Sequence, residues 1–138
     1  IIYLRRRLYR SYCIIRVPDM LKEKIAGIIE DITKVGGVRL CALVSRDGIM
    51  LGKHAAGDFN EAWFAAMCAT LLASAESAAV IIKVQSPEMV TIQTSDGILI
   101  IMGAGDKILL TTLIDPTADM ETVTASLRDI AEEVGGSF

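Results

Sequence analysis

Apolar residues recur at helical spacing early in the chain, in the segment LKEKIAGIIEDITKV. Ile25, Ile28, Ile29 and Ile32 stand at positions i, i+3, i+4 and i+7, which puts them on one face of a helix. A Gly-Gly pair at 36–37 follows, and glycine commonly ends a helix because it adopts a left-handed backbone without strain. The pattern predicts an amphipathic helix that ends before these glycines.

Alternating apolar and polar positions predict the strands. Residues 38–45, VRLCALVS, alternate and pass through the tight turn Arg46-Asp47-Gly48 into a return strand, IMLGKH. Asp-Gly between apolar runs is a strong hairpin signal. Residues 89–95 alternate in the same way and reach 98–104 through a second Asp-Gly, and 107–114 follows as a third strand. Segment 98–104 is apolar on both sides, which is typical of a central strand covered on both faces.

Two more helices complete the predicted order of elements. The segment 62–82 carries one charge, and Asp58 with Glu61 has the spacing of a capping box at its start. The last helix is expected at about 119–134, closed by Gly135-Gly136. The order is α-β-β-α-β-β-β-α, and short hairpin loops make consecutive strands antiparallel. The sequence predicts an α+β fold in which one five-stranded antiparallel sheet has helices on both faces.

The long middle helix has two unlike faces on a helical wheel at 100° per residue. One face is bulky and was expected to pack on the sheet, whereas the other is almost all alanine. The bulky face holds Phe64, Met67, Cys68, Leu71 and Ala75, with Leu72 near its edge, and the alanine face holds Ala62, Ala65, Ala66, Ala69 and Ala73, then Val80, with Glu76 beside them.

Three environments could suit this helix. A membrane span would have bulky aliphatic residues all round and would not contain Glu76, so no membrane span is expected. A surface helix usually carries Lys, Glu or Arg on its outer face, and a merely solvated alanine face remains an alternative. The interpretation we favour is that the alanine face packs closely against a second copy of the chain across a two-fold axis.

Composition supports a single domain that hides apolar surface in lipid or in a partner. The 138 residues are 52% hydrophobic and 22% charged, with a mean hydropathy of +0.47. Residues 20–138 hold nine Lys or Arg and sixteen Asp or Glu, a balance of −7. This acidic charge argues against nucleic acid as a partner.

The first nineteen residues differ from the rest. Residues 1–19 hold five arginines and one acid, Asp19, and the first methionine is Met20. We interpret 1–19 as a basic N-terminal extension, derived from a vector or from an upstream start site, and 20–138 as the domain. The alternative is a basic arm for an acidic membrane surface or partner.

Few residues are of the types that catalyse reactions or bind metals. Cys41 and Cys68, like the third cysteine, belong to no CxxC pair, and His54 is the only histidine; we expect no catalytic residue, metal or cofactor. Scattered cysteines are typical of reduced thiols in a cytoplasmic protein. The segment GAGDK at 103–107 lacks the spacing of a phosphate loop. Trp63 is either a packing residue or an anchor for a partner.

The order of these segments resembles the Roadblock/dynein light chain family, which includes prokaryotic regulators of Ras-like GTPases. The resemblance covers 20–138 and rests on VGGVRLCALVSRDGIMLG, the alanine-rich helix, the SDG turn and GILIIMGAGDKILLTTLIDPTADM. It implies a five-stranded antiparallel sheet with the middle helix on one face and the terminal helices on the other, as in the roadblock and profilin folds. It also implies a homodimer formed by the middle helix and the strand after it. The interface would comprise Ala62, Ala65, Ala66, Ala69, Ala73, Glu76, Met89, Val90, Thr91, Ile92, Gln93 and Thr94.

The function implied by the resemblance is regulatory rather than enzymatic. We expect a homodimer that binds a Ras-like small GTPase and modulates its nucleotide state or localisation. The alternative is a structural dimerisation or scaffold subunit of a larger complex, without effect on GTP turnover. A small-molecule sensor with an apolar pocket is a further possibility. Neither the GTPase nor the direction of the effect follows from the sequence.

Overall fold

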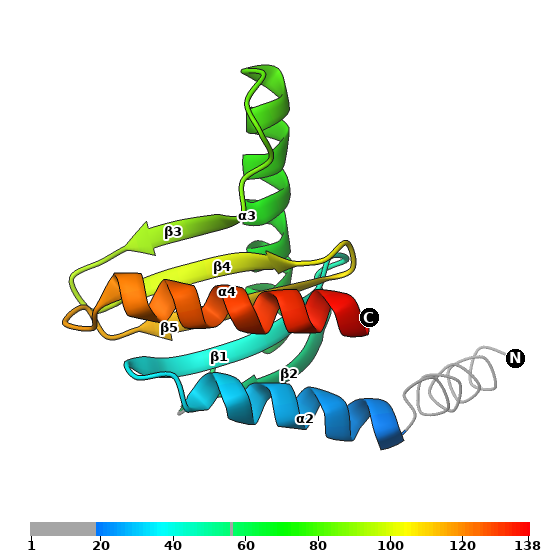
Figure 1. Ribbon diagram of the computed structural model, residues 1–138, viewed down its shortest axis with the longest axis vertical. Helices are drawn as coiled ribbons and strands as arrows, with labels where there is room; N and C mark the ends of the chain where they lie inside the picture. Colours follow the sequence, from blue (N-terminus) through cyan, green and yellow to red (C-terminus); the bar gives the residue numbers. More distant parts are fainter. Residues whose placement is uncertain (1–18, 56) are drawn as a thin grey trace, which may run out of the picture.

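A computed structural model describes residues 19–55 and 57–138 (Figure 1). The prediction for 1–18 lies outside the described residues, and the first described helix begins at Asp19, one residue before the expected domain start. The elements follow the predicted order. They are α2 (Asp19–Thr33), β1 (Val38–Ser45), β2 (Met50–His54), α3 (Glu61–Ile81), β3 (Met89–Gln93), β4 (Ile98–Ala104), β5 (Ile108–Ile114) and α4 (Met120–Ser137).

The five strands form one antiparallel sheet in the order β2-β1-β5-β4-β3. The predicted sheet is therefore confirmed. Strand β5 lies in the centre, and six of its seven residues are buried, as expected of a strand covered on both faces. The two edges are β2 and β3.

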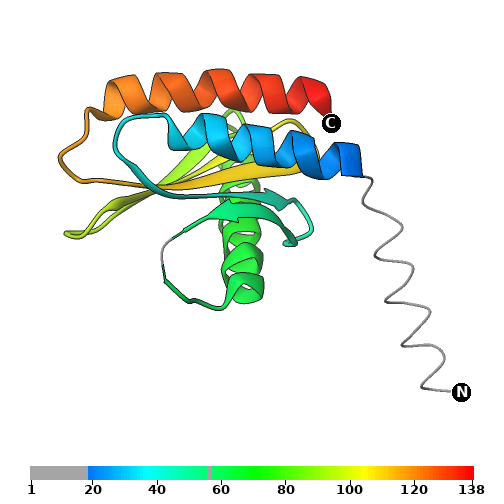
Figure 2. The same ribbon diagram turned by 90° about the horizontal axis from the view of Figure 1, so that it is seen from below.

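Helices cover the two faces of the sheet unequally (Figure 2). Helices α2 and α4 lie side by side on one face, where Cys41, Leu43 and Ile100 join residues of both helices in one buried cluster. Helix α3 lies on the other face over a second cluster that includes Val44 and Leu109. This arrangement is the predicted one, with the middle helix on one face and the terminal helices on the other.

Two predicted helix boundaries are wrong. Helix α3 begins at Glu61 rather than beside Asp58, because Asn60 is the N-cap and its side chain accepts a hydrogen bond from the Trp63 amide at 3.1 Å. Helix α4 continues through Gly135 and Gly136 instead of ending before them.

Gly135 is required for packing rather than for helix termination. A Cβ atom built on Gly135 would lie 3.0 Å from the amide nitrogen of Gly105, in the β4–β5 turn. Gly105 itself has φ of 73°, a conformation that favours glycine. The two glycines therefore let α4 touch the turn backbone to backbone.

Candidate interaction surface

The inner face of α3 is made of small side chains. Ala65, Cys68, Ala69 and Leu72 are buried against the sheet, with Ala65 fully inaccessible. The sheet supplies the bulk of this cluster through residues such as Ile101. Because strand side chains fill much of the space, the small residues Ala65, Cys68 and Ala69 let α3 approach the sheet closely, with Leu72 as a large side chain buried among them.

The predicted orientation of α3 is therefore wrong in part. Ala65 and Ala69, assigned to the dimer interface, pack on their own sheet, which makes them unavailable to a partner. Met67 and Leu71, expected to be inside, are 58% and 39% exposed. Phe64 and Cys68 do contact the inner cluster, as expected.

The outward side of α3 carries a row of large side chains one turn apart. Trp63 is 75% exposed and is followed at i+4 intervals by Met67 and Leu71. We call these three residues the outer stripe. Residues i and i+4 are neighbours on a helix, so they form one apolar strip. Ala62 and Ala73 of the predicted interface are also exposed, and Ala66 is half-buried.

The C-terminal end of α3 extends beyond the sheet. In Figure 1 the helix crosses the sheet and continues past β3 at the top of the picture. Four large aliphatic residues lie at this end, each 57–78% exposed. They are Val80, Ile81, Ile82 and Val84, and we call them the apolar tip.

The tip ends in a defined cap. The Ile82 amide donates to the Ala78 carbonyl at 3.2 Å, and the Val84 amide donates to the Ala79 carbonyl at 3.0 Å. Lys83 adopts a left-handed backbone with φ of 60°, the geometry of a residue just past a helix end. These bonds hold the exposed aliphatic side chains on an ordered helix end.

Edge strand β3 lies at the side of the sheet past which α3 extends (Figure 1), and its outer side is unpaired among the described residues. The Gly103 amide donates to Glu88, and the Thr94 amide donates to Gly97. Because hydrogen-bonding direction alternates along a strand, Met89, Thr91 and Gln93 direct their backbone groups outward.

The side chains of β3 alternate as well. Val90 packs on the α3 side with Leu99 of the neighbouring strand, and Met89 packs on the opposite side. Ile92 shares the face of Val90 because side chains two apart lie on one face. Val90, Ile92 and Leu99 are each only half-buried. The α3 face of the sheet is therefore apolar at its β3 edge, and α3 does not cover it completely.

The only two charged residues of α3 are both paired with the sheet. Glu61, in the first turn, pairs with Lys53 of β2. Glu76, a predicted interface residue, accepts a bond of 2.6 Å from Nη1 of Arg46. Helix α3 is thus tied to the sheet at two points 15 residues apart (76 minus 61), about 22 Å along the axis at 1.5 Å per residue.

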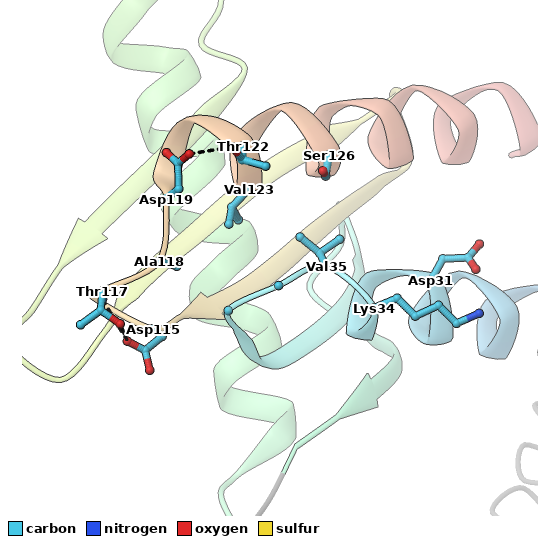
Figure 3. A pocket seen from close by; sticks show the side chains of 12 residues that line it. Asp31, Lys34, Val35, Asp115, Thr117, Ala118, Asp119, Thr122, Val123 and Ser126 are labelled. Atoms are coloured by element: carbon cyan, nitrogen blue, oxygen red, sulfur yellow. Dashed lines mark hydrogen bonds between the residues drawn. The ribbon is translucent and has the colours of Figure 1, made fainter.

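A surface cleft of about 680 Å³ lies on the other face, between the end of α2 and the start of α4 (Figure 3). Its carboxylates serve local structure. Asp115 accepts from the amide and hydroxyl of Thr117, and Asp119 caps α4 and accepts from the hydroxyl of Thr122. Hydrogen bonds from these threonines lower the pKa of both carboxyl groups. Across 19–55 and 57–138 no group of His, Cys, Asp and Glu is placed to hold a metal.

The two described cysteines are structural. Burial raises the pKa of the Cys41 thiol to about 11 and raises the pKa of Cys68 as well. Both thiols are therefore protonated and poor nucleophiles near neutral pH. His54 is exposed at the end of β2.

By length and composition alone, α3 is apolar enough to cross a membrane. Its inner positions, however, pack on the sheet with Ala42 and Val44. Helix α3 is therefore attached to the domain along one side, and 28% of its most apolar 18-residue window is buried.

Comparison with known proteins places the architecture in a family. Residues 24–114 match the model of the Roadblock/LC7 domain. The chain belongs to the Roadblock/LC7 family. A search of curated protein sequences finds no match.

Solved structures share the fold of this Roadblock/LC7 chain. Myxococcus xanthus MglB is similar with a TM-score of 0.78 and 16% identity, over 85% of this chain and 89% of that one. A structure described as MglB with tetrameric arrangement gives 0.74 and 21% identity, over 83% and 87%. A Roadblock/LC7 domain from Streptomyces avermitilis gives 0.69 and 18%, over 81% and 92%.

Apart from Val80, which the helical wheel places on the alanine face, the apolar tip was not predicted as an interaction surface, and neither was most of the outer stripe. A signal for the tip exists in the sequence, since AAVIIKV at 78–84 has a single charge at the end of a helix. The last turn of α3 has no basic residue, but α2 and α4 share that property, so the run of aliphatic residues is the signal. Trp63 was predicted as a possible contact, and its exposure is consistent with that role.

Proposed function

We propose that this chain is a non-enzymatic, cytoplasmic regulatory module that forms a homodimer and binds a Ras-like small GTPase, modulating its nucleotide state or localisation. The observation that carries the proposal is an ordered apolar helix end that extends past an unpaired strand edge. The family supports it, since regulators of Ras-like GTPases are among the proteins that the sequence resembles.

The dimer would form around a two-fold axis beside β3. Pairing of the outward backbone groups of Met89, Thr91 and Gln93 with those of a second copy would join the two sheets. The same axis would place each apolar tip over the half-buried Val90 and Ile92 of the other copy. A self-complementary surface of this kind suits a two-fold interface. Its apolar contact would contribute about 25 cal/mol for each Å² removed from water.

The neighbouring MglB structure supports self-association, since it is described as tetrameric. In the proposed dimer, Ala73 would lie nearer the partner copy than Ala62 and Ala66, because Glu61 ties the start of α3 to β2, at the opposite edge of the sheet from β3. Ala65 and Ala69 are excluded from this contact by their burial.

The outer stripe would provide the surface for the GTPase. Trp63, Met67 and Leu71 face away from the sheet, and a dimer would present two such stripes on one side of a continuous sheet. Exposed tryptophan is enriched among residues that dominate binding energy. We therefore propose Trp63 as the anchor for the GTPase.

The first test is the mass in solution. Each chain has a mass of 14.9 kDa, so light scattering coupled to gel filtration at micromolar concentration should give about twice that value if the proposal holds. A monomer at every concentration accessible would contradict the dimer.

The second test uses the Ras-like GTPases encoded in the same genome. Each is purified and mixed with the chain, and binding, GTP hydrolysis and nucleotide release are measured. Trp63→Ala should weaken binding by about 2 kcal/mol, or roughly 30-fold, while the dimer mass stays unchanged. Binding without a change in either rate would favour the scaffold alternative. Failure to bind any of these GTPases would overturn the proposed function.

A further inference from the structure

The two ion pairs that tie α3 to the sheet have different surroundings. Lys53 and Glu61 lie at the N-terminal end of the helix, where their side chains are 33% and 44% exposed. Arg46 and Glu76 are less accessible, at 29% and 34%. The second pair lies at the point where α3 leaves the sheet toward the apolar tip.

The Arg46 guanidinium is held from several directions. Its Nη1 atom donates to Glu76 at 2.6 Å, and its Nη2 atom donates to the Gly105 carbonyl at 3.0 Å. The Arg46 amide donates to the Lys107 carbonyl at 2.9 Å. Arg46 therefore connects the β1–β2 turn, the β4–β5 turn and α3.

The sheet makes room for this side chain. A Cβ atom on Gly103 would lie 2.8 Å from Nη2 of Arg46, and the same point is 3.8 Å from a methyl group of Leu72. The guanidinium thus lies between β4 and α3, close to the inner cluster. Its Nε atom is buried and has no hydrogen-bond partner among the described residues. Loss of Glu76 would leave a poorly hydrated cation with one acceptor, which is costly.

We propose that Arg46 is a positioning residue that fixes the direction of the C-terminal half of α3, and thereby places the apolar tip for the second copy of this chain. The inference rests on the proposed dimer for its effect on association. Its structural part, the restraint on α3, concerns the single chain.

The reason for this assignment is the lack of other restraints beyond Glu76. Of the five buried residues of α3, four lie between Ala65 and Leu72, and only Ala79 lies farther on. The C-terminal half therefore has few packing contacts to set its direction. A charge-assisted bond at its base, with bonds to two turns, supplies the missing restraint.

Glu76→Gln tests the proposal, with Glu61→Gln as the matched control on the same helix. Amide hydrogen exchange is followed by mass spectrometry in peptides that cover 64–72 and 78–85. The dimer dissociation constant is measured by sedimentation. Glu76→Gln should raise exchange in 78–85 and the dissociation constant by about tenfold each, with exchange in 64–72 and the circular dichroism spectrum unchanged. Glu61→Gln should change each by less than about twofold.

Arg46→Gln and the double variant separate positioning from direct contact with the partner copy. If Glu76 acts through Arg46, the double variant should weaken the dimer no more than Glu76→Gln alone. Additive effects of the two substitutions would show that Glu76 contacts the partner itself, and would overturn the role of Arg46. Arg46→Lys, which keeps the charge but cannot make both bonds, should give an intermediate exchange rate.

The proposed dimer and the restraint on α3 can be refuted separately. If the unmutated chain is a monomer, the proposed dimer fails, and the exchange measurement still decides whether Arg46 restrains α3. Equal exchange in Glu76→Gln and Glu61→Gln would overturn the restraint whatever the oligomeric state.

Discussion

The two edge strands of the sheet, β2 and β3, differ in how well they are protected from pairing with other chains. Edge strand β2 contains Lys53, and the pairing of β1 with β2 has a register shift between Leu43 and Val44. Helix α2 also lies close to this edge, since a Cβ on Gly52 would be 2.6 Å from a methyl group of Ile25. Charge, irregular pairing and a covering helix are the means by which proteins protect edge strands from other chains.

Edge strand β3 has none of these protections. Its five residues, MVTIQ, carry no charge and pair with β4 in regular register. The end of α3 extends beyond it with exposed aliphatic side chains. Of the two edge strands, β3 is therefore the one suited to pairing with another chain.

The largest effect is expected from a charge on the apolar tip. Ile82→Glu should abolish dimerisation, with a loss of at least about 3 kcal/mol or roughly 100-fold in the dissociation constant, because the carboxylate would be buried against the other copy. Ile49→Glu is the matched control: Ile49 is 62% exposed in the β1–β2 turn, away from β3, and Ile82 is 68% exposed. Sedimentation should show a monomer for the first variant and a dimer for the second; two dimers would refute the role of the tip.

A smaller effect is expected from removing one backbone donor at β3. Thr91→Pro deletes an outward amide and leaves the β4 ladder intact, so the dimer should weaken by about 2 kcal/mol. Thr91→Val keeps the amide and the side-chain shape and serves as the control. Analytical ultracentrifugation of both variants decides the matter, and equal dissociation constants would show that β3 does not pair.

The smallest effect is expected at the protected edge. Lys53→Val removes the charge of β2 and its pair with Glu61, which should produce weak association above about 100 μM, because other protections remain. Light scattering over a concentration series measures it, with Lys34→Val as a control on an exposed lysine outside the strands. Strong association of the Lys53 variant would mean that this one charge is sufficient to prevent β2 from pairing with another chain.

The fold could be predicted because its signals are local. Asp47-Gly48 and Asp96-Gly97 lie between alternating segments, and each joins a hairpin in the structure. Helix boundaries were less accessible to sequence reasoning, because Asn60 and Asp58 compete as caps and only geometry selects between them. Gly135 resembles a helix stop until its contact with Gly105 is known.

The interaction surface could be predicted only in part. A helical wheel shows that Ala65 and Ala69 share a side, but it does not show which side the sheet accepts. That choice depends on bulky strand residues such as Ile101. The extension of α3 past β3 depends on the crossing angle of helix and sheet, which periodicity does not contain.

The contact between Gly105 and Gly135 has a mechanical consequence. The two backbones are in direct contact there, and a Cβ atom on Gly135 would lie 3.0 Å from the Gly105 nitrogen. No side chain lies between them that could change rotamer and let α4 slide along the sheet. Tightly packed interiors transmit displacement rather than absorb it. Any displacement of α4 along the sheet would therefore have to move the β4–β5 turn with it.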